Sequence, residues 1–453
     1  MKSFRKIIAT TALVVVGSMS VATMASAESI VGTGATFPAT FQAAATVEYS
    51  KASGHSVSYS NPTGSGAGRT AFFTANQDFA GTDSAETAGS SRSTAFSWVY
   101  VPYVAGAISI AYRLDALNGA SLNLSIPTIA GIFDGTIKNW NDPLIAADMK
   151  LAPVWINAKE KSSFKGASAL WTETSETAST ATVTLTPAAL KKAKGKKIEV
   201  FEDKVKKPVK TVTVAKKGQI EVKLTTKKAS TYTIKVDGKN VAKFTQQDKT
   251  PILPSTPISV VYRSSTSGTT NNFIKPLNAF NSAWTVNDDF VKAIPGGVAP
   301  TSFQAGVGSD GVSNLIADTN GAIGYTEVSF VTDATRAAKG IRSANVKNVA
   351  GKFVAPTAAA TSSMIADSDI DSKGFVTFNF KQTANATAYP FVAITYALAK
   401  TAVSSKSVVV RGFLQWILTT YAPAAAESLG YAPLTGALLT VAKNNALRVG
   451  SGN

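Results

Sequence analysis

The chain has 453 residues, a formal net charge of +17, one histidine and no cysteine. The absence of cysteine excludes disulfides, thiol catalysis, Cys-ligated metal sites and a lipid anchor on an N-terminal cysteine. A His-based catalytic triad would need His55, which lies in a Gly-Ser turn where a solvated side chain is expected. The length allows for about three domains.

Residues 1–27 have the three parts of a secretory signal peptide. Lys2, Arg5 and Lys6 precede an apolar stretch that ends at Val16, and Ala25-Ser26-Ala27 forms an A-x-A cleavage site. The apolar stretch is too short to span a membrane by itself. We therefore expect cleavage after Ala27 and an exported mature protein, either periplasmic or at the cell surface.

Strand and helix patterns alternate over residues 28–155. Two Gly/Ser-rich turns, at residues 32–38 and 64–69, each lead from a strand pattern into a helix pattern. Apolar runs at 99–104 and 107–112 predict two further strands. This alternation predicts α/β lobes with mostly parallel sheets.

The composition changes abruptly near Lys159. Residues 159–249 contain 21 lysines, no arginine and nine acidic residues, an excess of +12. Apolar and polar residues alternate with period two in this segment, as at 220–224, and Asp237-Gly238 is a hairpin signal. We expect a small all-β domain, a sandwich of Ig-like type, inserted in a surface loop of the α/β unit.

The lysines of residues 159–249 predict a diffuse attraction to polyanions such as anionic cell-envelope polymers. Nucleic acid is not expected as a partner, because the segment lacks arginine and interleaved aromatic residues and the chain carries an export signal. The alternative is a solubilising surface on a spacer domain. The sequence leaves both interpretations open.

The α/β pattern resumes at Pro251. An apolar strand at 258–262 is followed by Arg263 and a Ser/Thr/Gly turn, and apolar residues then recur at helical spacing from Phe273. Pro276 is expected near the start of that helix, where proline is best tolerated. For the rest of the chain we expect an Ala/Thr-rich loop at 355–363, a strand at 392–398 and helices at 407–420 and 435–446.

Three Gly/Ser/Thr turns, at Thr36, Ser65 and Ser267, each precede a predicted helix. The free N–H groups and the dipole of a helix start favour an anion, and Arg263 adds a charged donor fork. A single turn of this kind is a weak signal, because capping residues are common. Three turns together with the arginine and the turn-borne Asp83 predict a small-anion site. The alternative is a set of polar turns with a surface arginine and an Asx-turn aspartate.

Five motifs follow one another in an order that resembles the phosphate-binding protein of the ABC phosphate importer. They are Gly34-Ala35-Thr36-Phe37-Pro38, Gly64-Ser65-Gly66-Ala67-Gly68, Asp78-Phe79-Ala80-Gly81-Thr82-Asp83, Arg263 through Thr269, and Gly321-Ala322-Ile323-Gly324-Tyr325. The resemblance implies a two-lobed periplasmic-binding-protein fold of type II. The implied division is a signal peptide at 1–27, lobe one at 28–102 and 390–453, lobe two at 103–156 and 251–389, and an inserted domain at 157–250.

The resemblance also implies eight phosphate-binding residues, named here the cradle residues: Thr36, Phe37, Ser65, Asp83, Arg263, Ser267, Gly268 and Thr269. Arg263 would be the cationic contact, and Asp83 would accept a hydrogen bond from the protonated oxygen of phosphate. Sulfate carries no proton at neutral pH, so a buried Asp83 would exclude it. Many family members have an acid two residues after the arginine, where this chain has Ser265.

The implied function is capture of inorganic phosphate by hinge closure and delivery to an ABC phosphate permease in the membrane. The protein would act as a monomer, without catalysis, cofactor or metal. Two alternatives stay open. One is an exported phosphatase that uses the same anion site, although the sequence shows no His set, Cys nucleophile or metal-ligand cluster for it. The other is a cell-surface adhesion or structural protein dominated by the lysine-rich domain.

Overall fold

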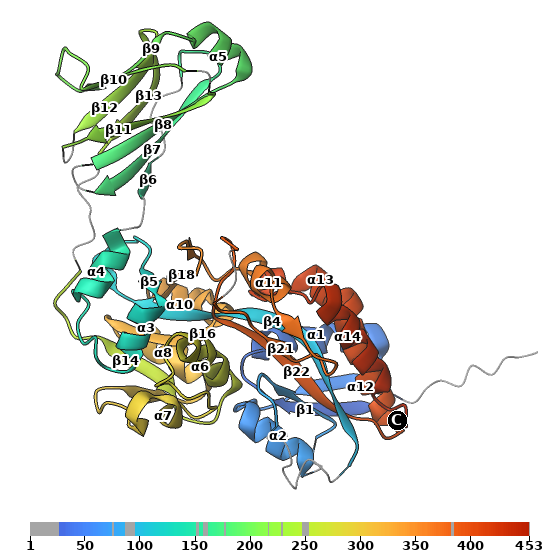
Figure 1. Cartoon of the computed structure of the whole chain (residues 1–453). Helices are drawn as coiled ribbons and strands as arrows, with labels where there is room; N and C mark the ends of the chain where they lie inside the picture. Colours follow the sequence, from blue (N-terminus) through green and yellow to red (C-terminus); the bar gives the residue numbers. More distant parts are fainter. Residues whose placement is uncertain are drawn as a thin grey trace, which may run out of the picture.

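The computed structural model shows a two-lobed α/β body with a separate β domain that stands off from it (Figure 1). It describes residues 27–74, 77–86, 96–150, 154–156, 162–175, 178–215, 217–227, 230–246, 253–381 and 385–452. The predicted signal peptide lies outside these residues, apart from Ala27. Among the described helices, none is both long and apolar enough to cross a membrane.

The body is organised around one sheet, which has nine strands in the described residues. The strand order is β15-β14-β16-β4-β22-β3-β1-β2, and β17 pairs with β4 at one side. Strand β4 (Trp98–Arg113) pairs with β22 (Val392–Lys400) up to Ala107, and with β16 from Ile108 onward. β4 therefore runs from one lobe into the other, as Figure 1 also shows.

The prediction of two strands at 99–104 and 107–112 is wrong, because β4 is one continuous strand. Nearly all of its residues are buried, so the small residues Ala105 and Gly106 lie within a fully covered strand and do not mark a turn. Pro102 has no N–H to donate. It lies beside a register shift between Thr395 and Tyr396 of β22, where the ladder is interrupted in any case.

Lobe one is formed by the parallel strands β1, β2 and β3 with helices from both ends of the chain. In the described residues its elements are β1 (Ser29–Gly34), α1 (Ala39–Ser53), β2 (Ser56–Tyr59), α2 (Ser65–Phe73), β3 (Phe79–Thr82), α12 (Ser405–Trp416), a π-helix (Ile417–Tyr421), α13 (Ala422–Ala425), the 3-10 turn Glu427–Leu429 and α14 (Gly436–Arg448). The predicted helices at 407–420 and 435–446 correspond to α12 with its π-helical continuation and to α14.

Lobe two is formed by the parallel strands β14 and β15, with β16 between β14 and the crossing strand β4. Its described elements are the 3-10 turns Asp115–Leu117 and Pro295–Gly297, β5 (Asn123–Ser125), α3 (Ile126–Phe133), α4 (Pro143–Lys150), β14 (Ser259–Arg263), α6 (Gly268–Phe280), α7 (Phe290–Ala293), β15 (Gln304–Gly306), α8 (Gly308–Asp318), β16 (Ala322–Glu327), α9 (Val328–Val331), α10 (Ala334–Ala338), β17 (Arg342–Ser343), β18 (Asn345–Lys347) and β19 (Phe353–Val354). Helix α11 (Ala358–Ala366) and the hairpin of β20 (Asp369–Ile370) and β21 (Val376–Thr377) lead back to β22.

Two predictions for this part of the chain are wrong. Pro276 lies inside α6 and not near its start, because the helix already begins at Gly268. Ser267 caps this start, since its hydroxyl accepts a hydrogen bond from the N–H of Thr270. The expected loop at 355–363 contains most of α11, whose start is capped in the same way by Thr357. Alanine favours a helix once such a cap fixes where it begins.

The inserted domain has two four-stranded sheets and a hydrophobic core of its own. Trp171 forms the centre of this core and stacks on Tyr232 and Phe244 at ring distances of 5.2 and 5.4 Å. The Asp237-Gly238 hairpin is confirmed, with positive φ at both residues. Its elements are β6 (Val154–Ile156), β7 (Ala167–Ser175), β8 (Ala178–Leu185), α5 (Pro187–Ala193), β9 (Lys197–Glu202), β10 (Lys210–Thr213), β11 (Gln219–Thr225), β12 (Thr231–Val236) and β13 (Lys239–Thr245). The Ig-like type and the exact bounds of the lobes and insert stay predictions.

Candidate functional site

The candidate site lies where the carboxyl ends of β1, β3 and β14 meet between the lobes. In an open α/β sheet this is the usual place for a ligand. Thr36 and Phe37 lie between β1 and α1, and Asp83 follows β3 directly. Arg263 is the last residue of β14, and Ser267 caps the start of α6. The sequence therefore brings three strand ends and their helix starts to one place.

Arg263 is buried, with 2% of its surface exposed. Its backbone N–H donates to the hydroxyl of Tyr325 at 3.2 Å. Its Nε, Nη1 and Nη2 atoms, by contrast, have no hydrogen-bond partner among the described residues. Burial lowers the pKa of the guanidinium, which the charge of Glu327 partly opposes. A buried cation with all donor groups unused costs several kcal/mol unless an anion compensates it, so this geometry fits an oxyanion.

Asp83 is also buried, and both of its carboxylate oxygens accept hydrogen bonds from hydroxyl groups. Thr395 donates to Oδ1 at 2.7 Å and Ser65 donates to Oδ2 at 3.3 Å. Burial raises the pKa of this carboxyl to about 7, even though both hydroxyls act to lower it. A carboxyl with a pKa near neutrality can share a proton with a bound oxyanion.

The two lobes contact each other directly through the predicted site residues. The hydroxyl oxygens of Thr36 and Ser309 are 2.9 Å apart. The N–H of Gly268 donates to Oγ of Ser65 at 3.2 Å. A Cβ atom on Gly268 would lie 2.5 Å from that oxygen, so only glycine allows this approach. The structure thus shows a closed arrangement in which donors of the two lobes face one another.

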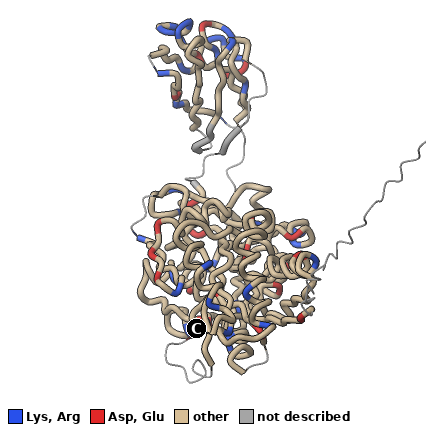
Figure 2. The backbone as a smooth tube through the Cα atoms, turned by 90° about the vertical axis from the view of Figure 1, so that its right-hand side faces the viewer, with Lys and Arg blue, Asp and Glu red and all other residues tan. Residues whose placement is uncertain are grey.

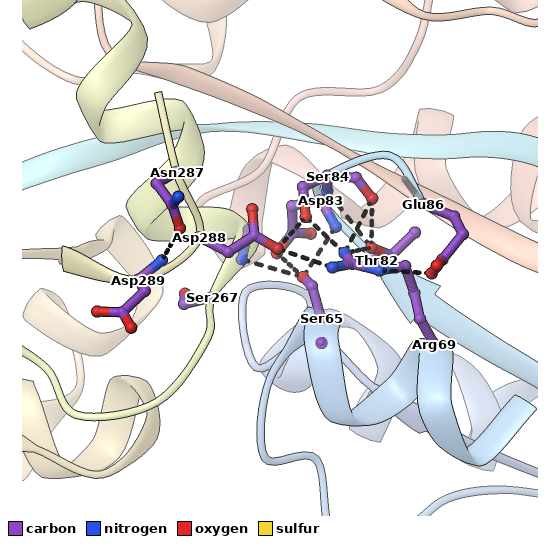
Figure 3. A network of polar contacts seen from close by, with 12 residues as sticks. Ser65, Arg69, Thr82, Asp83, Ser84, Glu86, Ser267, Asn287, Asp288 and Asp289 are labelled. Carbon is purple, nitrogen blue, oxygen red and sulfur yellow. Dashed lines mark hydrogen bonds and ion pairs between the residues drawn. The ribbon is translucent and has the colours of Figure 1, made fainter. Parts of the chain in front are cut away.

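A second polar network closes the lobes beside the site (Figure 3). Arg69 of lobe one donates to Asp288 of lobe two at 2.8 Å, and its Nε lies 3.2 Å from Glu86. The hydroxyl of Ser84, the residue after Asp83, also donates to the carboxylate of Asp288, at 2.8 Å. This network holds the turn that carries Asp83 against the loop that precedes α7.

The structure places all eight cradle residues at or next to the contact between the lobes. The side chain of Arg263 lies close to the loop that holds Ser65. Its Nη2 atom is 3.5 Å from the position that a Cβ atom on Gly64 would occupy. The ring of Phe37 is fully buried, and its carbonyl accepts a hydrogen bond from Tyr431 at 2.6 Å. That these residues bind an anion stays a prediction, which the unpaired donors of Arg263 support.

Several buried residues that contact cradle residues were not predicted from the sequence, among them Ser309, Glu327 and Thr395. Ser309 follows Gly308 at the start of α8, so a fourth Gly/Ser turn before a helix was the available signal. Glu327 ends β16, two residues beyond the motif at 321–325. Thr395 lies within an apolar strand that is more than 300 residues from Asp83 in the chain, and no local pattern identifies it.

Comparisons with known proteins agree with this geometry. A profile of the PBP superfamily domain matches residues 20–240 and 180–420. The phosphate-binding protein PstS 2 of Mycobacterium tuberculosis is 27% identical over 387 residues, which cover 80% of this chain and 71% of that protein. The phosphate-binding protein PstS of Xylella fastidiosa is 31% identical over 191 residues, or 40% of this chain and 48% of its own length.

Solved structures share the fold at low sequence identity. A high-affinity periplasmic phosphate-binding protein, PfluDING, solved with bound phosphate at pH 8.5, is similar with a TM-score of 0.58 and 21% identity. The similarity covers 93% of this chain and 96% of that one. A phosphate-binding protein from Stenotrophomonas maltophilia gives a TM-score of 0.53 and 16% identity, over 92% and 93% of the two chains. These similarities show a two-lobed binding-protein fold.

Proposed function

We propose that this chain, which belongs to the PBP superfamily, is an exported solute-binding protein that encloses inorganic phosphate and delivers it to an ABC permease. The observation that carries the proposal is the buried guanidinium of Arg263, whose three nitrogens have no hydrogen-bond partner among the described residues. A phosphate oxygen pair matches this planar donor fork. The phosphate-binding proteins to which this chain is similar point to the same ligand.

Phosphate would bind through donors from both lobes. Thr36, Phe37 and Ser65 would contribute from lobe one. Ser267, Gly268 and Thr269 would contribute from the start of α6, where N–H groups and the helix dipole favour an anion. Some of these donors bond across the lobes in the closed structure. We infer that bound phosphate replaces these hydrogen bonds between the lobes with hydrogen bonds to itself, and so stabilises the closed arrangement.

Asp83 would provide the selectivity for phosphate over sulfate. A phosphate oxygen that keeps its proton can donate to the Asp83 carboxylate, whereas sulfate has no proton to offer. An oxyanion facing a buried carboxylate without a donor between them loses several kcal/mol. Calorimetry with phosphate, arsenate and sulfate tests the proposal. We expect one phosphate per chain and no measurable heat with sulfate, and equal affinity for both anions would overturn it.

The protein would act without catalysis. The described residues contain no group of three or more His, Cys, Asp or Glu side chains that could hold a metal ion. No observation therefore favours the phosphatase alternative. Incubation with a chromogenic phosphate ester, with and without divalent metals, checks this point directly, and metal-dependent release of the chromophore would favour the enzyme.

The inserted domain would retain the protein at an anionic cell-envelope polymer. Its helix α5 and the start of β9 expose five lysines, named here the tip lysines: Lys191, Lys192, Lys194, Lys196 and Lys197. Lys196 forms an exposed ion pair with Asp237 at 3.5 Å. The strand register places these lysines at the end of the domain opposite its links to the body, and the basic residues of the domain, all lysines, gather in this outer part (Figure 2).

Retention by the insert suits a protein whose sequence has no cysteine for a lipid anchor. Lysine provides a compact, hydrated charge that attracts polyanions without geometric specificity. The test compares the full chain with a variant that lacks residues 159–249 on purified envelopes washed with rising salt. We expect the full chain to be retained at low salt and the variant to wash off. Equal retention would leave the insert as a spacer.

A further inference from the structure

Asp288 lies in the loop before α7 and contacts residues on both sides of the proposed phosphate site (Figure 3). Its Oδ2 atom accepts hydrogen bonds from Nη2 of Arg69 and from the hydroxyl of Ser84, both at 2.8 Å. Its backbone carbonyl accepts a hydrogen bond from the N–H of Ser267 at 2.9 Å. Ser84 follows Asp83 directly, and Ser267 is a cradle residue that caps α6. This one residue of lobe two therefore connects the Asp83 turn of lobe one with the turn that starts α6.

Lobe one holds the side chain of Arg69 in place by itself. Nη1 donates to Oγ1 of Thr82 at 3.1 Å and to Oγ of Ser84 at 2.6 Å, and Nε lies 3.2 Å from Oε2 of Glu86. These three partners belong to lobe one, so they stay with Arg69 when the lobes part. Nη2 is the nitrogen that donates to Asp288 of lobe two. A guanidinium fixed in this way loses little further conformational freedom when the carboxylate arrives.

The ion pair of Arg69 and Asp288 belongs to the closed arrangement, because its two residues lie in different lobes. The helix that carries Arg69 packs closely on lobe two, since a Cβ atom on Gly66 would lie 2.2 Å from Oγ1 of Thr266. Arg263 is 2% exposed in this arrangement, so phosphate has to enter before the lobes close. The ion pair then forms after phosphate has entered, and it has to break before phosphate can leave.

We propose that Arg69 and Asp288, named here the latch, set how long the closed protein holds its phosphate. The inference rests on the proposed function and adds two positioning residues that lie outside the cradle. The latch would act on release and not on capture, because interactions that form after the encounter change mainly the dissociation rate. The side chains of Arg69 and Asp288 are only 10% and 14% exposed in the closed structure. Water therefore screens this ion pair less than a surface pair.

The experiment measures phosphate association and release by stopped-flow fluorescence. The chain has no cysteine, so a fluorophore on Val307→Cys labels one position, which is 71% exposed and lies close to the contact of Ser309 with lobe one. In this labelled parent, Asp288→Ala should release phosphate roughly ten-fold faster, while its association rate stays within about two-fold. Asp115→Ala is the control, because its ion pair with Arg113 lies within lobe two. It should leave both rates unchanged.

A double-mutant cycle with Arg69→Met tests whether the two residues act as a pair. Arg69→Met can also disturb lobe one, because Glu86 loses this ion pair. The effect of Asp288→Ala is therefore measured again in the Arg69→Met background, where it should shrink from roughly ten-fold to less than about three-fold. The remainder would come from the hydrogen bond of Ser84. A ten-fold effect in both backgrounds would mean that the two side chains act separately, and would overturn the inference.

Two other results would overturn the latch and leave phosphate binding itself intact. One is an unchanged release rate in Asp288→Ala. The other is slower association together with lower thermal stability of phosphate-free Asp288→Ala, which would give the residue a merely structural role. Failure of the labelled parent and of the unlabelled wild type to bind phosphate would instead remove the proposed function.

Discussion

In the proposed function, the cradle residues and the tip lysines would meet negative charge in opposite ways. In the cradle, one arginine is 2% exposed and lies in a site built from residues at three helix starts. On the insert, five lysines are exposed on one end of a small β domain. Burial strengthens each contact and fixes its geometry, whereas water and salt weaken an exposed charge. Affinity and selectivity for a small anion therefore depend on the buried site, although the net charge of the chain lies mainly in the insert.

The largest effect is expected from Arg263→Met. Charge-assisted hydrogen bonds are worth about 1.5–3 kcal/mol each, and a guanidinium fork makes two or more, so phosphate affinity should fall by at least about 150-fold and by as much as about 20,000-fold. Thermal stability without phosphate should stay equal or rise, because a buried uncompensated charge is removed. Calorimetry and thermal melting measure the two effects. Arg342→Met, at an exposed arginine of β17, is the control and should change neither.

Asp83→Asn should reduce the discrimination between phosphate and sulfate by about 100-fold. The amide keeps the shape of the carboxyl and can donate a hydrogen bond to an unprotonated sulfate oxygen. Sulfate affinity should therefore rise while phosphate affinity falls. Titration of both anions into wild type and variant gives the ratio. An unchanged ratio would mean that the selectivity comes from the donors and not from Asp83.

The same substitution should stabilise the fold in phosphate-free buffer at alkaline pH. The pKa of Asp83 is raised to about 7, so the native state binds this proton more tightly than the unfolded chain. Stability is therefore lost as pH rises from about 4 to about 7, and the penalty is complete above that range. At about pH 8 Asp83→Asn should gain a few kcal/mol, at most about 4, and at about pH 4 almost nothing. Thermal or urea unfolding at both pH values measures the difference.

The tip lysines should matter for retention and not for phosphate. Replacing the five by glutamine should lower the salt concentration that releases the protein from envelopes by roughly two-fold, because exposed charges act through screened attraction. The control replaces five exposed lysines of the body, Lys138, Lys339, Lys352, Lys373 and Lys443, and has the same net charge. Phosphate affinity should stay within about two-fold in both variants. Release of the two five-lysine variants at the same salt concentration would show that net charge alone retains the protein.

Local features of the candidate site could be predicted from the sequence and contacts between distant segments could not, for a physical reason. The turns at Thr36, Ser65 and Ser267 are local, since a strand end, a glycine and a helix start lie within a few residues. Such turns could be found without a structure. Contacts between distant segments could not. Thr395 donates to Asp83 across 312 residues of chain, and nothing in an apolar strand indicates which of its residues faces a carboxylate.

The start of α6 shows the same limit on a smaller scale. The sequence predicts the helix after the turn proposed to bind an anion, with Pro276 near its first residues. The structure instead begins the helix at Gly268, within the turn. The Ser267 cap and the short approach of Gly268 to Ser65 of the other lobe decide this boundary. One of these two contacts is a tertiary one, so periodicity alone placed the helix several residues too late.

The smallest effect is expected from Ser265→Asp, which restores the acid that many family members have after the arginine. The sequence departs from the family pattern at this position. In the structure, however, Ser265 is exposed, and its hydroxyl donates to the carbonyl of Thr63 at 3.4 Å. Water screens a carboxylate at such a place, and the buried Glu327 already acts on Arg263. Phosphate affinity should therefore change by less than about three-fold, which is under about 1 kcal/mol. A ten-fold or larger loss of phosphate affinity in calorimetry would show that the carboxylate at this position reaches Arg263 in solution. This position, and not Glu327, would then set the negative charge that acts on Arg263.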